Sequence, residues 1–233
     1  MKIEIVPAII AEDYEHLGDE IHHVAKHVKV VQIDVTDGKF APSKTWPYNN
    51  PHDEIWRDLV KQEIGLPEWE KLDFEIDLMV ENQIEEAEKW ISAGATRVIG
   101  HIEAFKEGDK EKFKSLRDQF GVELWLSLNP STANSVLDEH LEYLDGVQFM
   151  GNDKIGFHGV SLDEKVLEKI AELRTKTNAL GKPDFPIGID IGVNFETAQK
   201  LRESGVTHFA VGSLILNDEN PGQIIEELNN ILV

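Results

Sequence analysis

Apolar and polar residues alternate along this chain in two periods that replace each other from end to end. Lys2 to Ile10 alternates with period two and is rich in Ile and Val, as in a half-buried strand. In Asp13 to Lys26, Tyr14, Leu17, Ile21 and Val24 recur three and four apart, the period of a helix face. The N-terminal region therefore predicts a strand followed by a helix.

The same strand and helix patterns recur throughout the chain. Further strands are predicted over Val28–Asp37, Asp73–Val80, Arg97–Glu103, Glu123–Asn129, Gly146–Gly151, Pro186–Gly192 and His208–Leu216, and further helices over His52–Ile64, Ile84–Ala93, Asp109–Phe120, Asn134–Leu144, Leu162–Leu180, Phe195–Ser204 and Pro221–Leu232. Alternating strands and helices indicate parallel pairing. Eight such units without a linker predict one α/β domain over residues 1–233, a (β/α)₈ TIM barrel. A doubly wound open sheet is the alternative.

The connection from Lys39 to Pro51 departs from this rhythm. It contains three Pro, Trp46, Tyr48 and two Asn, and is long for a loop in a compact domain. Two interpretations stay open, a functional lid and a surface insertion packed by its own aromatic residues.

Composition limits the function classes. The formal net charge of -21 argues against binding to nucleic acid, whose phosphates require Lys and Arg, and against binding to anionic membranes. No apolar run is long enough to span a membrane, and the N-terminus lacks the features of a signal peptide. The chain has no Cys, which excludes thiolate metal sites and disulfides. A cytoplasmic protein is expected.

Polar residues late in the strands are candidates for chemistry, because the site of such a barrel lies at the C-terminal ends of its strands. In one alternation phase these are Gln32, Asp34, Glu75, Asp77, Met79, His101, Glu103, Ser127, Asn129, Gln148, Met150 and Asp190. Two carboxylates facing one cavity can share acid–base work. Asp34, Asp77 and Asp190 with Gln32 offer an all-oxygen site, which favours Mg²⁺ or Mn²⁺ over Zn²⁺.

Glycine-containing loops follow the last three predicted strands and indicate an anion site. They are Gly156–Gly159, Ile191–Gly192 and Gly212–Ser213. Barrel enzymes often bind phosphate at this place through backbone N–H groups and a helix N-terminus.

Several segments together resemble the ribulose-phosphate 3-epimerase family in order and spacing, from about Ile5 to Leu216. They are VPAIIAEDY, VVQIDVTDGKFAP, FEIDLMVEN, HIEA, LNPST, the GFHG loop, IDIGVN and AVGSLI. The resemblance implies a (β/α)₈ barrel that interconverts ribulose 5-phosphate and xylulose 5-phosphate. In such an enzyme two Asp move a proton at C3 through an enediolate, and a divalent metal (Mg, Mn, Fe or Zn) polarises the carbonyl.

The resemblance also assigns residue roles in this chain. Asp34 and Asp190 match the acid–base pair, and Gln32, Asp34, Asp77 and Asp190 occupy the metal-ligand positions. The positions expected to bind substrate and phosphate are Met79, Asn129, Met150, Gly156, His158, Gly159, Gly192, Gly212 and Ser213. The expected partner is a phosphorylated sugar, and a homo-oligomer is compatible with the family.

Some positions depart from the family pattern. Gln32 and Asp77 replace two metal-binding His, Ala8 replaces a substrate-contacting Ser, and Thr36 replaces a Met. Ile191 replaces the first Gly of the usual DGG. Three hypotheses follow: a sugar-phosphate epimerase with a remade metal site, a related barrel enzyme acting on another phosphorylated sugar, and a non-catalytic sugar-phosphate-binding relative.

Overall fold

The computed structural model describes residues 2–157 and 159–233. Eight strands form a closed barrel in chain order, and every neighbouring pair is parallel. The strands are β1 (Glu4–Ile9), β2 (Val30–Thr36), β3 (Asp73–Met79), β4 (Arg97–His101), β5 (Glu123–Leu128), β6 (Gly146–Met150), β7 (Ile187–Asp190) and β8 (His208–Val211). The predicted (β/α)₈ fold is confirmed.

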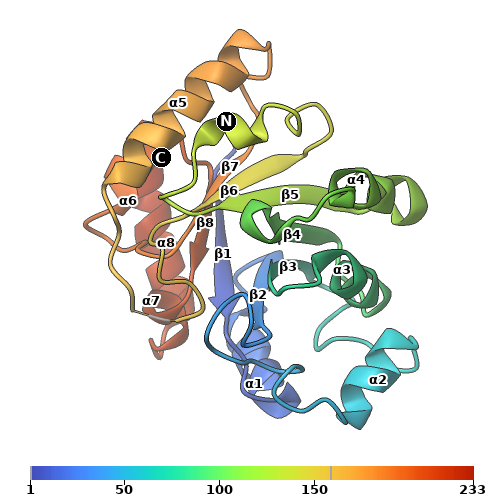
Figure 1. Cartoon of the computed structure of the whole chain (residues 1–233). Coiled ribbons are helices and arrows are strands. Elements are labelled where there is room, and N and C mark those ends of the chain that lie inside the picture. Colours follow the sequence, from blue (N-terminus) through green and yellow to red (C-terminus); the bar gives the residue numbers. More distant parts are fainter. Residues whose placement is uncertain (1, 158) are drawn as a thin grey trace.

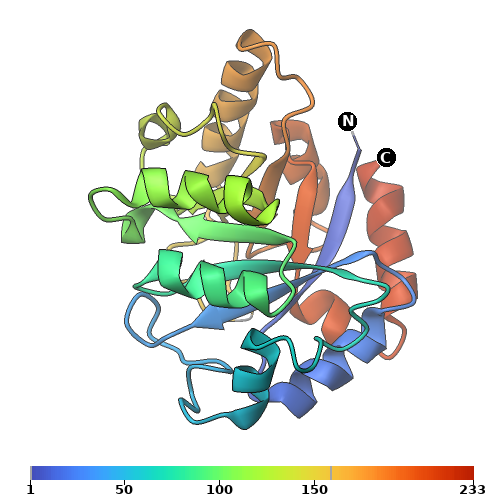
Figure 2. The same ribbon diagram turned by 90° about the vertical axis from the view of Figure 1, so that its right-hand side faces the viewer.

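Helices surround the barrel on its outside (Figures 1 and 2). They are α1 (Tyr14–Val24), α2 (Glu54–Val60), α3 (Gln83–Ser92), α4 (Asp109–Phe120), α5 (Lys165–Ala179), α6 (Ala198–Ser204), α7 (Ser213–Leu216) and α8 (Pro221–Leu232), with 3₁₀ turns η1 (Ile102–Ala104) and η2 (Asn134–Leu137). Asp13 caps α1 by accepting a hydrogen bond from the His16 N–H at 2.8 Å, and Asp53 caps α2 in the same way through Trp56.

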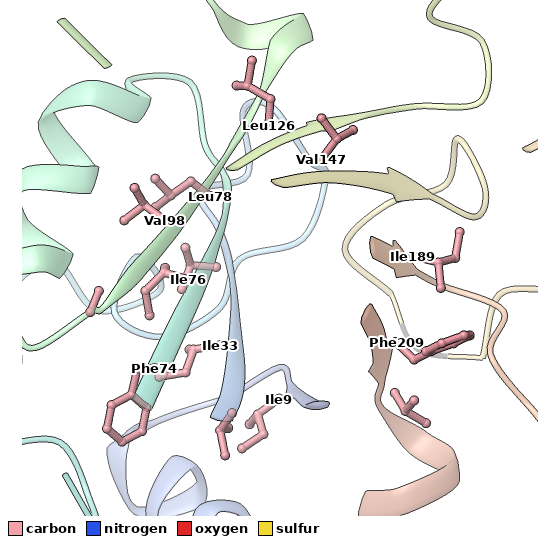
Figure 3. Close-up of a cluster of buried hydrophobic side chains, with 14 of the residues drawn as sticks. Ile9, Ile33, Phe74, Ile76, Leu78, Val98, Leu126, Val147, Ile189 and Phe209 are labelled. Atoms are coloured by element: carbon pink, nitrogen blue, oxygen red, sulfur yellow. The ribbon is translucent and has the colours of Figure 1, made fainter. Parts of the chain in front are cut away.

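The main apolar core lies between the barrel and the helices. Figure 3 shows side chains contributed by all eight strands, labelled Ile9, Ile33, Phe74, Ile76, Leu78, Val98, Leu126, Val147, Ile189 and Phe209. Alternate residues of a strand point to opposite faces of the sheet. Ile33 in β2 and Ile76 in β3 therefore face the helices, whereas the polar residues next to them in the sequence face the barrel interior. The outward face of the sheet packs against the helices, and the inward face carries polar side chains.

Two predicted elements are wrong in part. Asn134–Leu144 is not a helix: only η2 is helical, and tight turns follow, as in the hydrogen bond from the His140 N–H to Leu137 O at 2.8 Å. These turns bury Leu137, Leu141 and Leu144, so the apolar spacing is satisfied without an α-helix. The last strand stops at Val211, because the chain leaves the sheet at Gly212 and forms α7.

Other predicted boundaries also shift. The strand predicted to reach Glu103 ends at His101, and η1 carries Glu103. Helices α2, α5 and α6 are shorter than predicted, whereas Pro221–Leu232 is confirmed in full. The shorter helices leave irregular segments at the C-terminal ends of the strands, where the site is expected.

The loop from 39 to 51 is packed and not extended over solvent. Trp46 is 1% exposed and contacts the rings of Tyr14, Trp56 and Trp90, with centroid distances of 5.6 to 5.9 Å. The Tyr48 hydroxyl donates to Glu86 at 2.8 Å. The aromatic residues of the loop thus pack on α1, α2 and α3 and not on one another.

Candidate functional site

Three carboxylates meet inside the C-terminal end of the barrel. Asp34, Asp77 and Asp190 come from β2, β3 and β7, are all buried, and offer oxygen atoms that lie within 4.8 Å of one another. The register explains part of this meeting, because Asp34 pairs with Asp77 across β2 and β3. Three buried like charges are costly unless protons or a cation neutralise them.

Asp77 is held from two sides. His101 Nε2 donates to its Oδ1 at 2.7 Å, and Gln148 Nε2 donates to its Oδ2 at 3.1 Å. Burial lowers the pKa of His101, but the Asp77 carboxylate and its hydrogen bond raise it more, so the net shift is upward. The contact with Asp77 thus favours the imidazolium form of His101.

Gln32 lies next to Asp34 in the barrel interior. Its Nε2 donates to Asp34 Oδ1 at 2.8 Å. Its Oε1 is buried and has no hydrogen-bond partner among the described residues. A buried carbonyl oxygen without a partner is the kind of ligand atom that a hard cation prefers.

Burial and charge crowding perturb the two Asp expected to act in catalysis. Burial, followed by the charge of Asp77, raises the pKa of Asp190 to about 7, although the Ile191 N–H donates to it at 2.8 Å. Burial, followed by Asp190 and Asp77, raises the pKa of Asp34 well above its ordinary value. Their environment therefore keeps a proton in the cluster near neutral pH.

A cavity of about 440 Å³ opens over this cluster. Asp34 and Asp190 lie in its wall together with Met79. Met79 also packs with Met150, Ala41 and Ile155 in a small buried apolar cluster, so Met150 lies one layer behind the wall. An apolar wall beside paired carboxylates limits water at the place where a proton would move.

The three predicted anion-binding loops reach the same cavity. Gly156, Gly159, Gly192, Gly212 and Ser213 all line it. His158 lies outside the described residues. The loops after β6, β7 and β8 thus share one cavity with Asp34 and Asp190.

Some candidates from the sequence lie elsewhere, among them Asn129 and Glu75. Among the described residues, the cavity wall does not include Asn129, whose N–H donates to Glu103 at 2.8 Å and whose carbonyl accepts from Lys169 at 2.7 Å. Glu75 lies one layer deeper in the barrel, where it pairs with Arg97 and with His208. Glu75 therefore belongs to the barrel floor, the end of the barrel interior at the N-termini of the strands, and not to the carboxylate cluster.

The structure adds wall residues that sequence reasoning missed. Ile10, Val160, Ser161, Asn194 and Asn217 line the cavity, and they lie in the connections that follow β1, β6 and β7 or directly after α7. Their position after strands is the one signal that points to them. None has a distinctive residue type.

Comparison with known proteins gives a consistent result. The model of the "Ribulose-phosphate 3 epimerase family" matches residues 4–216. The ribulose-phosphate 3-epimerase of Bacillus subtilis (strain 168) is 30% identical over 227 residues, which cover 97% of this chain and 98% of that protein. The enzyme of the same name from Candida glabrata is 29% identical, with 95% and 89% covered.

Solved structures support the fold. The 3-keto-L-gulonate-6-phosphate decarboxylase from Vibrio cholerae superposes with a TM-score of 0.70 at 13% identity, covering 99% of this chain and 97% of that one. A structure of KGPDC from Streptococcus mutans gives 0.69 at 14% identity, with the same coverage. At these identities the likeness concerns the barrel alone.

No helix within residues 2–157 and 159–233 has the length and apolar character needed to cross a membrane.

The expectation of an enzyme is supported by the relatives, which carry the name of a carbohydrate epimerase. Since the family model matches nearly the whole chain, this protein belongs to the ribulose-phosphate 3 epimerase family.

Proposed function

We propose that this protein is a ketose-phosphate 3-epimerase acting on ribulose 5-phosphate and xylulose 5-phosphate. The observation that carries the proposal is the pair Asp34 and Asp190, both buried, both with raised pKa, and both in the wall of one cavity. Groups with pKa values near the working pH are suited to acid–base catalysis.

Asp34 and Asp190 act as acid and base on opposite sides of the substrate. One carboxylate removes the C3 proton to give an enediolate, and the other, as a carboxylic acid, returns a proton to the opposite face. Strands β1 and β8 separate β2 from β7 around the barrel, and their cavity residues Ala8 and Ala210 have small side chains. The small side chains keep the cavity open beside the two Asp.

A divalent metal fits the donor set. Asp34, Asp77 and Asp190 would hold it, with the free Oε1 of Gln32 as a further oxygen ligand. The two bonds that Asp77 accepts leave further lone pairs on its oxygens. The metal supplies a positive charge that polarises the ketone, and an all-oxygen set favours Mg²⁺ or Mn²⁺.

The phosphate binds in the part of the cavity that the loops after β6, β7 and β8 line. Gly159, Gly192, Gly212 and Ser213 lie in its wall there, and the Gly residues have no side chain that would keep an anion away from the backbone. With a net charge of -21, the protein has to attract an anion locally, and oriented backbone N–H groups do this without a nearby Lys or Arg.

The first prediction tests the reaction itself. With Mn²⁺ or Mg²⁺ in deuterated water, we expect the protein to exchange the C3 proton of ribulose 5-phosphate, measured by NMR. Asp34→Asn and Asp190→Asn should each lose about 10²–10⁴-fold in rate, as expected for a positioned acid or base. Asp118→Asn, an exposed carboxylate in α4, is the matched control and should keep full activity. Identical rates in wild type and Asp34→Asn would contradict the proposal.

Two other functions remain as alternatives to this reaction. A related enzyme on a different phosphorylated sugar is favoured by the altered wall, in which Ala8 and Ile191 line the cavity. It predicts turnover of another member of a phosphosugar panel. A non-catalytic binding protein is favoured by the loss of both metal-binding His, and predicts phosphosugar affinity without turnover.

A further inference from the structure

A second cavity lies in the outer layer of the barrel, near the N-terminal ends of β3 and β4. This outer groove has a volume of about 630 Å³ and lies between the connection from 61 to 72, the start of β3 and the end of α3. Leu66, Leu72 and Phe74 form its buried apolar base. Among the described residues, none lines both the outer groove and the cavity of Asp34 and Asp190. The proposed reaction therefore leaves the groove unexplained.

Two apolar side chains at the rim of the outer groove face water. Trp69 is 62% exposed and Ile64 is 42% exposed, whereas the other four Trp of the chain are buried or half-buried. The Trp69 ring lies on Gly65, where an added Cβ would come within 2.5 Å of Trp69 Cδ1. The Tyr14 hydroxyl donates to Gly65 O at 3.1 Å and ties this turn to α1. An exposed Trp held beside an apolar hollow is typical of a surface that contacts another protein.

The charged groups of the outer groove are acidic. Among the described residues that line it, the charged ones are Glu63 and Asp73, and both are exposed. Within residues 2–157 and 159–233, neither carboxylate has an ion-pair or hydrogen-bond partner. Two unpaired carboxylates beside an apolar hollow favour a ligand with positive charge and oppose one with negative charge.

We propose that the outer groove docks a basic, partly apolar segment of another protein. An aliphatic or aromatic side chain of that segment fills the hollow, and its Lys or Arg residues lie beside Glu63 and Asp73. A ligand enclosed by the hollow would leave Trp69 and Ile64 in water, whereas a peptide chain that crosses the rim covers both. The inference is independent of the proposed reaction, because docking here leaves the catalytic cavity open.

A second copy of this chain is the poorer occupant. A symmetric contact at the groove would bring Glu63 and Asp73 against the same two carboxylates of the other copy. Each copy also carries a net charge of -21, so the two surfaces repel each other. Charge complementarity therefore selects a basic partner.

The experiment selects binding peptides without presuming a sequence. Random peptides displayed on phage are selected on the wild-type protein in the presence of excess soluble Trp69→Ser variant, which removes peptides that bind elsewhere. We expect the enriched peptides to combine Leu, Phe or Trp with several Lys or Arg. The absence of enrichment, or enriched peptides without Lys and Arg, would overturn the proposal.

Binding of one enriched peptide, measured by fluorescence anisotropy at physiological salt, then locates it on the surface. Trp69→Ser and the double variant Glu63→Lys, Asp73→Lys should each weaken binding by at least about 10-fold, because each removes one part of the recognition. Leu180→Ser and Glu168→Lys are the matched controls and should leave the affinity unchanged. Leu180 is 56% exposed, Glu168 is an exposed carboxylate, and both lie in or directly after α5. Equal affinities in the groove and control variants would show general attraction to an acidic surface and would refute the groove.

Sedimentation velocity tests the other occupant. Wild type and Trp69→Ser should have the same mass over a range of protein concentrations, because the groove is not expected to join two copies. Self-association that Trp69→Ser abolishes would assign the groove to a second copy and would overturn the proposal.

Discussion

Asp77 shows how one substitution changes the chemistry of a whole site. A third carboxylate joins Asp34 and Asp190 within 4.8 Å, and His101 and Gln148 each donate to it. The added negative charge raises the pKa of both neighbouring Asp, after the larger effect of burial for Asp190, and after burial and Asp190 for Asp34. A site of this kind binds protons and cations in competition.

The competition gives a prediction on metal affinity. With the pKa of Asp190 at about 7 and that of Asp34 also raised, at least one proton must leave before a metal binds at lower pH. We expect the Mn²⁺ association constant, measured by titration calorimetry, to rise about tenfold per pH unit for each proton displaced between pH 5.5 and 7.

The control for this prediction removes one of the titrating groups. Asp190→Asn should bind Mn²⁺ more weakly and with a shallower dependence on pH, since one proton fewer is displaced. Calorimetry in buffers of different ionisation enthalpy counts these protons directly. An Mn²⁺ affinity independent of pH in the wild type would show that the cluster is already deprotonated.

For single residues, the sequence predicts which side chains face the barrel interior better than it predicts how deep in the barrel they lie. Asp34 and Asp190 are found from strand alternation, because a carboxylate on the inward face near a strand end is unusual in a core. Alternation also selected Glu75, which the structure pairs with Arg97 and His208 on the barrel floor. Arg97 is the register partner of Glu75 on the neighbouring strand β4, whereas His208 comes from β8, so only closure of the barrel reveals the contact with His208.

At the element scale, the loop from 39 to 51 connects the packed outer layer with the site. Its second half is anchored by Trp46, whose indole N–H donates to Asp53 at 3.3 Å. Its first half reaches the site, where Ser43 Oγ donates to Gly156 O at 2.9 Å. The anchoring aromatic residues therefore position a contact with the loop that follows β6.

Trp46 gives the prediction for this element. Because its ring is 1% exposed and packs on three aromatic rings, Trp46→Ala should lower the free energy of unfolding by about 3–5 kcal/mol. Urea denaturation measures the change. Trp69→Ala is the matched control, since Trp69 is 62% exposed and should shift the free energy by less than about 0.5 kcal/mol. Equal losses in the two variants would refute the anchoring role.

Helices and strands whose apolar residues follow one clear period were predictable from the sequence. Segments held by tertiary hydrogen bonds, or suited equally to a helix and a strand, were not. Helix α8 begins at Pro221 and keeps its apolar stripe, so its bounds follow from the sequence. In η2 the Asn134 side chain donates to Lys169 O at 2.8 Å, a tertiary bond that the local pattern does not contain. The short helix α7 was hidden because SLIL is equally suited to a strand.

At the scale of the whole molecule, the barrel carries charged clusters at both ends of its interior. The acid cluster lies at the C-terminal end. At the floor, Glu75 is buried beside Arg97 and His208, and Arg97 also donates to Glu123 at 2.7 Å and stacks on the Trp125 ring at 4.6 Å from its centroid. Opposite charges pair at the floor, whereas like charges gather at the site.

His208 is the titrating cation of the floor. Its Nε2 lies 2.8 Å from Glu75 and its Nδ1 lies 3.3 Å from Glu4, so an imidazolium donates to a carboxylate on each side. Burial lowers the pKa of His208, and Arg97 does so slightly, but the two carboxylates raise it above 6.5 overall. The pKa of Glu75 is lowered, and that of Glu4 falls to about 2, chiefly through its hydrogen bond to His208.

These shifts fix the sign of the pH dependence. A raised His208 pKa gives stability that is complete below about 6.5 and is lost as pH rises through the folded-state value. Lowered Glu pKa values give stability that is present above about 4.5 and is lost as pH falls toward 2. The floor should stabilise the fold most strongly between these limits.

The acid cluster also loses stability as pH rises, because the pKa values of Asp34 and Asp190 are raised. The contribution of His208 therefore has to be measured separately from that of the acid cluster. We expect the free energy of unfolding, from urea denaturation at pH 5.5 to 9, to fall with a slope of at most about 1.4 kcal/mol per pH unit for the His208 proton. His208→Asn should remove that part of the slope, whereas the exposed His52→Asn should leave it unchanged. A wild-type minus His208→Asn difference that stays constant across this range would show that His208 is neutral in the folded protein.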